Sequence, residues 1–180
     1  MNFTYEADRV ILKILDESYA EQVLCFSQEN ADIFMNYEQS YPENYFTREY
    51  QSLLLKGYLK QFTEMHSARY YVFLKDTPSL IIGCVGLSDI RLNSDKSATL
   101  YYKADRAYVK RGYITEAVSC LLWHAADELK LHRIEADILP ENKSSIALVK
   151  RLGFEFEGIA KSSHEIQGDW RDHERYALIL

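Results

Sequence analysis

The sequence predicts a single domain of the α/β (α+β) class that spans residues 1–180. Its length of 180 residues is close to the usual size of one domain. Hydrophobic residues make up 47% of the chain, with only 7 glycines and 3 prolines, so the chain can bury a large core and lacks the composition of a disordered protein. Segments patterned like strands alternate with segments patterned like helices, which favours this fold class.

The amino-terminal half predicts a strand followed by two helices. An apolar run at residues 10–15 suits the strand, and Asp16 after it is a plausible N-cap for a helix towards Gln28. The aromatic segment that follows is irregular and contains Pro42. Thr47 is the expected N-cap of the second helix, which runs through about Phe62.

A hairpin, a third strand and a long helix are expected in the middle of the chain. Residues 69–75 and 80–88 predict the two hairpin strands, joined by a turn that contains Asp76, Pro78 and Ser79. Residues 98–103 predict the next strand. From residue 114 to 129, apolar side chains recur with the i, i+3, i+4, i+7 spacing of a helix with one buried face, and Gly112 marks its start.

The last third predicts a strand, a helix and two more strands. Residues 132–139 suit a strand, and residues 144–152 suit a helix that ends at Gly153. Strands at 154–161 and 175–180 flank a turn in the sequence QGDW. The strand, helix, strand order over residues 98–139 requires a right-handed crossover and a parallel strand pair, whose carboxyl ends are the usual place for a ligand.

The charge distribution points to one local anion site. The formal net charge of −6 argues against a general nucleic-acid-binding protein, which needs an excess of basic residues. Residues 103–111 reverse this balance, with four basic side chains against one acidic side chain. A basic turn with a glycine before a helix is typical of phosphate binding, because unpaired N–H groups and the helix dipole face the anion. A solvated surface loop is the alternative interpretation of this turn.

Two motifs around this turn resemble the Gcn5-related N-acetyltransferases, and within them the group that includes the ribosomal-protein N-terminal acetyltransferases. The first is VKRGYITEAV at 109–118, in which Gly112, Glu116 and Ala117 match the family's pyrophosphate loop. The second lies in residues 132–158, where Asn142 and Ser145 match an N-x-x-S pattern that is followed by LGF at 152–154. Asp172 and Tyr176 match the closing strand. The resemblance covers about residues 80–180 well, and the amino-terminal half matches only in the order of its elements.

The resemblance implies a mixed, mostly antiparallel central sheet flanked by helices, with a parallel strand pair splayed around the cofactor. It also implies acetyl-CoA as the cofactor, with its thioester between strands that end near Tyr102 and Asp137 and its phosphates over residues 110–115. The residues expected to contact the cofactor are Tyr102, Lys103, Val109, Lys110, Arg111, Gly112, Tyr113, Ile114, Thr115, Asn142 and Ser145.

Three positions depart from the family pattern. Val109 stands where the family has Gln or Arg, Lys110 where the subgroup often has Gly, and Ile114 where a small residue is usual. Backbone N–H groups matter more than side chains in such loops, and Lys110 or Arg111 could replace lost charge. These departures leave a non-catalytic acyl-CoA-binding module open as an alternative to an enzyme.

Acetyl transfer to an amine needs an unprotonated amine, and a base assists. Strand alternation places Glu135 and Asp137 on one face, and both are candidate catalytic residues, with Asp137 the first candidate to receive the proton. A surface role is the alternative for both carboxylates. Ser145 is the candidate acid for the thiolate, or else a helix cap. A backbone N–H near Tyr102 would meet the oxyanion, and most of the acceleration would come from orientation of the reactants.

The remaining expectations concern the acceptor and the setting. The acceptor is expected to be a protein N-terminal α-amine, by subgroup resemblance, with a polyamine or an aminoglycoside as the alternative. Residues 16–49 contain eight acids and several tyrosines and would attract a cationic amine, with a solvated acidic helix face as the alternative. The opposite wall would be formed by His164, Glu165, Asp169, Asp172 and His173. The spacing of the three cysteines suggests neither disulfides nor a metal site. No signal peptide or membrane span is expected, so the chain is predicted to be cytoplasmic. A monomer or homodimer is expected, with no nucleic-acid or membrane partner.

Overall fold

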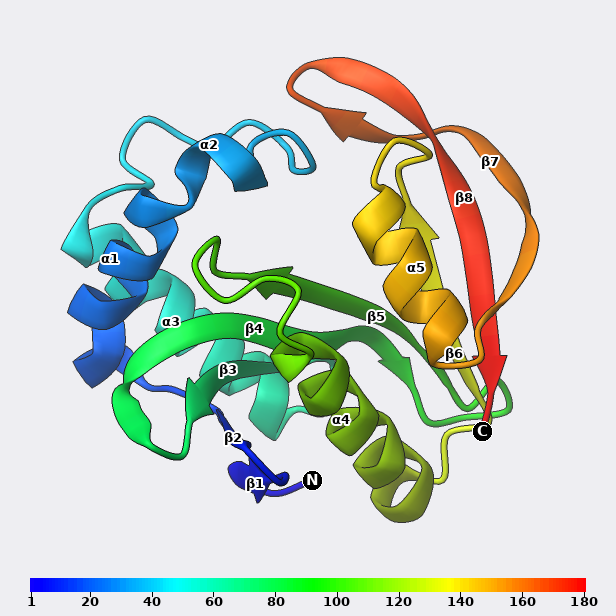
Figure 1. Ribbon diagram of the computed structural model, residues 1–180, viewed down its shortest axis with the longest axis horizontal. Helices are drawn as coiled ribbons and strands as arrows, with labels where there is room; N and C mark the ends of the chain where they lie inside the picture. Colours follow the sequence, from blue (N-terminus) through cyan, green and yellow to red (C-terminus); the bar gives the residue numbers. More distant parts are fainter.

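One eight-stranded sheet runs through the chain in the computed structural model, which describes all 180 residues (Figure 1). The strand order is β1-β2-β3-β4-β5-β6-β8-β7. Every neighbouring pair is antiparallel except β5 and β6, which are parallel as the sequence predicted. The elements follow in the order β1 (Thr4–Glu6), β2 (Val10–Lys13), the 3₁₀ turn η1 (Glu17–Tyr19), α1 (Ala20–Glu29), α2 (Ala31–Phe34), α3 (Arg48–Thr63), β3 (Ala68–Leu74), β4 (Thr77–Arg91), β5 (Ser97–Ala104), α4 (Tyr113–Leu129), β6 (Arg133–Ile138), α5 (Lys143–Arg151), β7 (Glu155–Ile166) and β8 (Asp169–Ile179).

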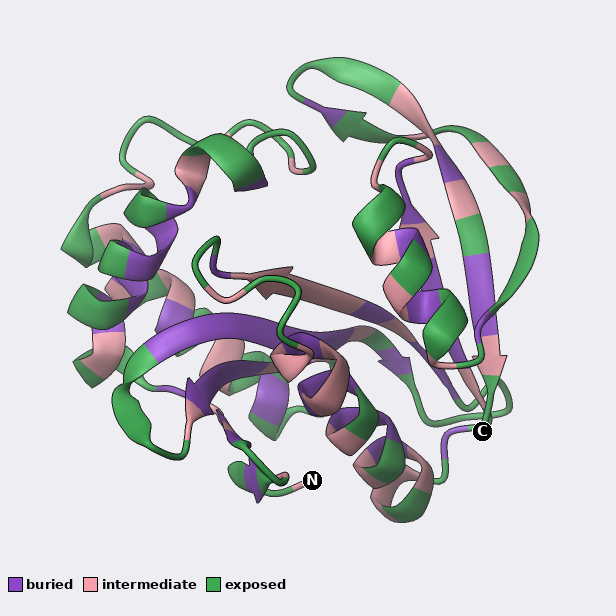
Figure 2. Ribbon diagram, in the orientation of Figure 1, coloured by how far each residue is buried: buried purple, intermediate pink, exposed green.

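Helices cover both faces of the sheet, and alternate strand residues fill the two cores. Tyr70 and Val72 of β3 belong to the larger buried cluster, which includes the inner side of α4 and Val149 of α5. Tyr71 and Phe73 point the other way, into a smaller cluster with residues of α1 and α3. Figure 2 shows the buried residues concentrated in the central strands and on the inner sides of the helices, while the tip of the β7–β8 hairpin is exposed. None of the helices is long and apolar enough to cross a membrane.

Local capping signals placed the helices correctly. The Asp16 carboxylate accepts a hydrogen bond from the Ser18 N–H at the start of η1, the turn that leads into α1, and the Thr47 hydroxyl accepts from the Tyr50 N–H at the start of α3. Gly112 begins α4 and Gly153 follows α5, and both adopt the left-handed conformation that glycine permits, with φ of 83° and 90°. Strand β1 and the single turn of α2 were not predicted.

The turn of the first hairpin was predicted two residues too wide. The chain reverses at Lys75–Asp76, and β4 already begins at Thr77, which pairs with Leu74. Pro78 and Ser79 therefore lie in β4 and not in the turn. The pairing with β3 is irregular there, with register shifts on both sides of Phe73. A proline is tolerated at this point because the shifted ladder does not require its missing N–H.

The last hairpin is longer than predicted, because β7 extends to Ile166 and β8 begins at Asp169 rather than at residue 175. The turn itself is at the predicted place, with Gln167 and Gly168 both at positive φ. The added length carries polar residues on both faces and so lacks the apolar alternation that reveals a strand.

The parallel strand pair separates soon after it forms. β5 and β6 pair only through Ser97↔Arg133, Ala98↔Ile134 and Thr99↔Glu135. β5 continues to Ala104 and β6 to Ile138 without further pairing between them. The splayed pair predicted by resemblance is therefore present, and the strand edges beyond Thr99 and Glu135 face each other without a ladder.

Candidate functional site

The turn between β5 and α4 presents a row of free backbone donors. None of the turn, loop or cap hydrogen bonds uses the N–H groups of residues 109–115, and no side chain caps α4. The first residues of a helix have no intrahelical acceptor for their N–H groups. Gly112 and Lys110 both have positive φ, at 83° and 61°, which bends the chain into the start of the helix. The structure thus brings together the predicted residues Val109, Lys110, Arg111, Gly112, Tyr113, Ile114 and Thr115.

A buried polar pair fixes the beginning of this turn. The Asp105 carboxylate accepts hydrogen bonds from Asn30 Nδ2 at 2.9 Å and from the Ala107 N–H at 2.8 Å. Asn30, which is fully buried, also accepts from the Arg106 N–H through Oδ1 at 2.9 Å. Buried polar groups that satisfy one another in this way hold a loop in one conformation. The end of α1 therefore positions the turn.

Arg9, in the loop between β1 and β2, holds the other end of the turn. Its backbone N–H and its Nε donate to the Glu116 carboxylate at 2.6 Å and 2.7 Å, and its Nη1 donates to the Arg111 carbonyl at 3.3 Å. Its guanidinium also stacks over the Tyr113 ring, 4.7 Å from the centroid. The sequence interpretation missed Arg9, because nothing near it in the chain signals a partner 107 residues away.

The bulky residue at position 114 is accommodated by the core. The Ile114 side chain is buried, and its Cδ1 would lie 2.5 Å from a Cβ atom added at Gly83 of β4. Ile114 therefore points into the sheet, and only its backbone belongs to the turn surface. Val109 is exposed and Lys110 and Arg111 are exposed beside it. Of the three departures from the family pattern, Ile114 is thus directed away from the turn surface, and Val109 and Lys110 are exposed.

Across the splay, the start of α5 is tied to β5. Asn142 is the N-cap of α5, and its Oδ1 accepts from the Ser145 N–H at 3.1 Å. The alternative interpretation of Ser145 as the cap is therefore wrong, and its hydroxyl makes no hydrogen bond within the chain. The Tyr102 hydroxyl donates to the Ser145 carbonyl at 3.1 Å. Burial raises the pKa of Tyr102 to about 12, so this phenol stays protonated.

Lys103 lies on the opposite face of β5 from Tyr102. Its ammonium forms an ion pair with Glu38 and lies 4.9 Å from the centroid of the Phe34 ring of α2. Successive residues of a strand point to opposite faces of the sheet. Because the Tyr102 side chain points towards α5, the Lys103 side chain points to the other face. The structure therefore places Lys103 with the acidic segment after α2 and away from the free N–H groups.

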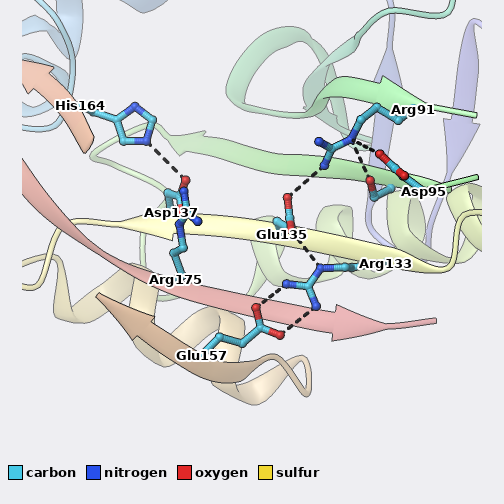
Figure 3. A network of polar contacts seen from close by, with 9 residues as sticks. Arg91, Asp95, Arg133, Glu135, Asp137, Glu157, His164 and Arg175 are labelled. Atoms are coloured by element: carbon cyan, nitrogen blue, oxygen red, sulfur yellow. Dashed lines mark hydrogen bonds and ion pairs between the residues drawn. The ribbon is translucent and has the colours of Figure 1, made fainter. Parts of the chain in front are cut away.

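Glu135 and Asp137 lie on one face of β6, as the alternation predicted, but they have different partners (Figure 3). Glu135 accepts from Arg91 Nη2 at 3.2 Å and from Arg133 Nε at 2.9 Å, and Arg133 also binds Glu157. Asp137 lies nearer the end of β6, with Arg175 Nε at 3.4 Å and His164 Nε2 at 3.3 Å. The ion pairs of Glu135 are with arginines alone, whereas Asp137 contacts a histidine as well as an arginine.

His164 reaches Asp137 because β7 is bulged. Residues 161–163 fall out of register between Ala160↔His173 and His164↔Arg171. Ser162 has a φ of 46°, and its N–H donates to the Asp172 carboxylate at 2.8 Å, which stabilises the bulge. A bulge redirects the side chains that follow it. The sequence interpretation placed His164 only in an outer wall, since the predicted strand stopped at residue 161.

The same hairpin meets the acidic segment that follows α2. Gln167 Nε2 donates to the Glu38 carbonyl at 3.0 Å, so the tip of the hairpin contacts this segment, and Figure 1 shows the two approaching each other. Tyr41 and Tyr45 stack there with ring centroids 4.0 Å apart, and Tyr41 donates to Glu38. Burial raises the pKa of Tyr45 to about 12, so the ring remains neutral. The predicted aromatic and acidic wall is thus assembled on the face that contains Asp137 and Lys103.

The chain has clear relatives. The family model of the acetyltransferase (GNAT) domain matches residues 9–155. A probable N-acetyltransferase of Bacillus subtilis (strain 168), YjcK, is 32% identical over 170 residues, which cover 94% of this chain and 93% of that protein. The [ribosomal protein uS5]-alanine N-acetyltransferase of Escherichia coli (strain K12) is 29% identical, over 95% of this chain and 88% of that protein.

Solved structures agree with these relatives. The ribosomal-protein-S5-alanine acetyltransferase of Vibrio fischeri superimposes with a TM-score of 0.91 and 25% identity, over 99% of this chain and 97% of that chain. The free N–H groups before α4, the splayed parallel strands and these similarities agree with the resemblance, the enzyme class and the cofactor predicted from the sequence. The chain belongs to the GNAT acetyltransferases, enzymes that transfer an acetyl group from acetyl-CoA.

Proposed function

We propose that this chain transfers an acetyl group directly from acetyl-CoA to the α-amine at the N-terminus of a protein. The observation that carries the proposal is that a turn rich in free N–H groups and a carboxylate–imidazole pair lie on the two sides of the splayed strands β5 and β6. The first can hold a diphosphate and the second can receive a proton. An acetyltransferase acting on an amine needs both.

The residues before α4 fit a diphosphate. The N–H groups of residues 109–115 and the positive end of the α4 dipole would hold the phosphate oxygens, and Lys110 and Arg111 would add charge. Acetyl-CoA supplies, when bound, a thioester whose carbonyl carbon an amine can attack. The edge of β5 beyond Thr99 has no strand partner on the β6 side, so N–H groups near Tyr102 are free to stabilise an oxyanion.

We assign the proton of the attacking amine to His164, with Asp137 as its partner. A histidine hydrogen-bonded to a carboxylate is a common general base near neutral pH, and the carboxylate orients the ring. Glu135, the other candidate, instead holds Arg91 and Arg133 in place. On the opposite face, the free Ser145 hydroxyl is the proposed proton donor to the departing thiolate, beside the protonated Tyr102.

The choice of an α-amine rests on its acidity and on the relatives. An α-amine has a reference pKa of about 7.7 to 8.0, against about 10.4 for lysine, so a larger fraction is unprotonated at neutral pH and a weaker base suffices. The Escherichia coli relative is named for the alanine of a ribosomal protein. The eight acids of residues 16–49, against Arg48 alone, favour approach of a cationic acceptor.

The test is thiol release from acetyl-CoA with a panel of amines, followed by mass spectrometry of the products. A peptide with a free N-terminal alanine should be acetylated at its α-amine. The same peptide with a blocked N-terminus and an internal lysine, and spermidine as a polyamine, should react far more slowly. Preferential acetylation of spermidine would assign the chain to small-molecule acceptors, and binding of acetyl-CoA without turnover of any amine would favour the non-catalytic module.

A single domain, a monomeric or homodimeric state and a cytoplasmic location stay predictions.

A further inference from the structure

Arg69 of β3 has a guanidinium with no carboxylate partner. Its Cζ lies 4.2 Å from the ring centroid of Tyr58 on α3 and 4.8 Å from that of Tyr101 on β5. Its Nε is buried and has no hydrogen-bond partner. The ionisable groups that face it are four phenols and one thiol, and none of them is a carboxylate: Tyr45, Tyr58, Tyr71, Tyr101 and Cys84.

The sheet is built to bring Tyr101 and Arg69 together. Gly86 of β4 lies between them in register, paired with Arg69 on one side and Tyr101 on the other. A Cβ atom at Gly86 would lie 2.3 Å from Cζ of the Tyr101 ring, so the ring crosses β4 where this glycine leaves room. Any other residue there would separate the ring from the guanidinium.

This arrangement is on the same face of the sheet as Asp137. Thr99 of β5 pairs with Glu135 of β6, and two residues further along these parallel strands are Tyr101 and Asp137. Side chains two residues apart on a strand share a face, so Tyr101 and Asp137 point to the same side. Arg69 therefore lies on the face of the sheet that contains Asp137, where the proposed function places the acceptor. Tyr101 of β5 lies between Arg69 of β3 and Asp137 of β6.

A partly desolvated guanidinium among aromatic rings is costly unless something else compensates, because cation–π contacts replace only part of the lost hydration. Its planar row of donors matches a carboxylate in two-point geometry. We propose that Arg69 binds an acidic side chain of the acceptor protein and so selects the N-termini that this chain acetylates. This inference rests on the proposed function and names a subclass of its substrates.

The spacing of the strands sets the position of that acidic residue. Strands β3 and β6 are three strand spacings apart, about 14 Å, and the Arg69 side chain spans part of this distance to reach the Tyr101 ring. In the proposed function the reacting amine lies beside Asp137 of β6, which leaves about 10 Å between the amine and the Arg69 guanidinium. An extended peptide advances about 3.3 to 3.6 Å per residue. The carboxylate therefore belongs to the third or fourth residue of the acceptor, and the carboxylate of a free amino acid is too close to its amine to reach Arg69.

The test compares acceptor peptides that differ only in residues 3 and 4, which are Glu, Gln or Lys. The wild-type protein should acetylate the Glu peptide with a kcat/KM about tenfold or more above that of the Gln peptide, as expected for a charged hydrogen bond, and the Lys peptide should be the poorest. In Arg69→Met the ratio of kcat/KM for the Glu peptide to kcat/KM for the Gln peptide should fall to about one, because only the kcat/KM for the Glu peptide decreases. Arg151→Met, which removes an exposed charge at the end of α5, should keep the wild-type ratio.

The comparison separates a binding role from a structural one. If Arg69 only joined α3 to the sheet, Arg69→Met would lower kcat/KM for all three peptides by the same factor, and this result would overturn the inference. Equal rates for the Glu, Gln and Lys peptides with the wild-type protein would overturn it without any variant, and would leave the proposed function standing. Absence of turnover with every peptide would overturn the proposed function, and the inference with it.

Discussion

Gly112→Ala tests whether the turn before α4 holds the cofactor. Gly112 has a φ of 83°, in the left-handed region, where an alanine costs about 1 to 2 kcal/mol. The added Cβ would lie 3.4 Å from Nη2 of Arg9, the end of a flexible side chain, so crowding adds little. The backbone can relieve the strain only by rotating, and rotation turns the N–H groups of residues 112 and 113 away from the anion.

The size of the effect follows from the hydrogen bonds lost. A hydrogen bond to a charged group contributes about 1.5 to 3 kcal/mol, so loss of one raises the dissociation constant of coenzyme A about tenfold to a hundredfold. Gly153→Ala is the matched control. Gly153 has a φ of 90°, and its added Cβ would lie 3.6 Å from Cδ1 of Leu178, an ordinary contact, so this variant has the same strain at the far end of α5.

Calorimetric titration with coenzyme A and thermal unfolding together give the answer. Both variants should unfold at lower temperature, by about 2 to 4 °C for each kcal/mol in a chain of this size. Only Gly112→Ala should lose affinity for coenzyme A. Equal affinity in the two variants and the wild type would show that the free N–H groups of this turn do not hold the cofactor, and the proposed function would lose its main support.

Three further predictions follow from side-chain contacts. Asp137→Asn and His164→Gln should each lower kcat about a hundredfold without changing the affinity for coenzyme A. The double variant should be no slower than either single variant, because the two residues act as one unit. Additive losses of kcat in steady-state kinetics would contradict this. Burial, and then the charge of His164, lower the pKa of His173 below the ordinary histidine value of about 6.5. As the pH falls through this range, the unfolded chain binds more protons than the folded chain. The free energy of unfolding therefore falls as the pH falls. His173→Gln should reduce this slope in denaturant titrations between pH 7.5 and 5, and an unchanged slope would exclude His173. Gly83→Ala should destabilise the chain by about 1 to 3 kcal/mol, since its Cβ would lie 2.5 Å from both Ile114 Cδ1 and the Lys103 carbonyl oxygen; Gly57→Ala, with nothing within 4 Å in the middle of α3, should instead stabilise it by about 0.5 to 1 kcal/mol.

The parts of the fold that were predictable are those written in local sequence. Asp16 and Thr47 cap helices through their own side chains, and Gly112 and Gly153 bound helices through their own backbone freedom. The errors lie where local sequence is ambiguous. The outer half of the β7–β8 hairpin is polar on both faces, and Pro78 lies in a strand because the opposite strand is irregular there.

The candidate site divides in the same way. The free N–H groups of residues 109–115 could be predicted, because a glycine in a basic turn before an amphipathic helix is a local pattern. His164 could not be assigned to Asp137, since a three-residue bulge fixed by Asp172 sets its direction. The Arg69 arrangement depends on Gly86 and Tyr101, which lie on two other strands, so only the register of the sheet reveals it.

The amino-terminal residues that hold the turn should therefore control cofactor binding without touching the cofactor. Backbone donors bind an anion well only when they are already oriented, because ordering them on binding would cost part of the affinity. Arg9 fixes one end of the turn through Glu116 and Arg111, and Asn30 fixes the other through Asp105 and Arg106. Asn30 is fully buried, so its loss would leave the Asp105 carboxylate and the Arg106 N–H without their partner. The first thirty residues thus stabilise the conformation on which the phosphate site depends, although the motif that reveals this site begins only at Val109.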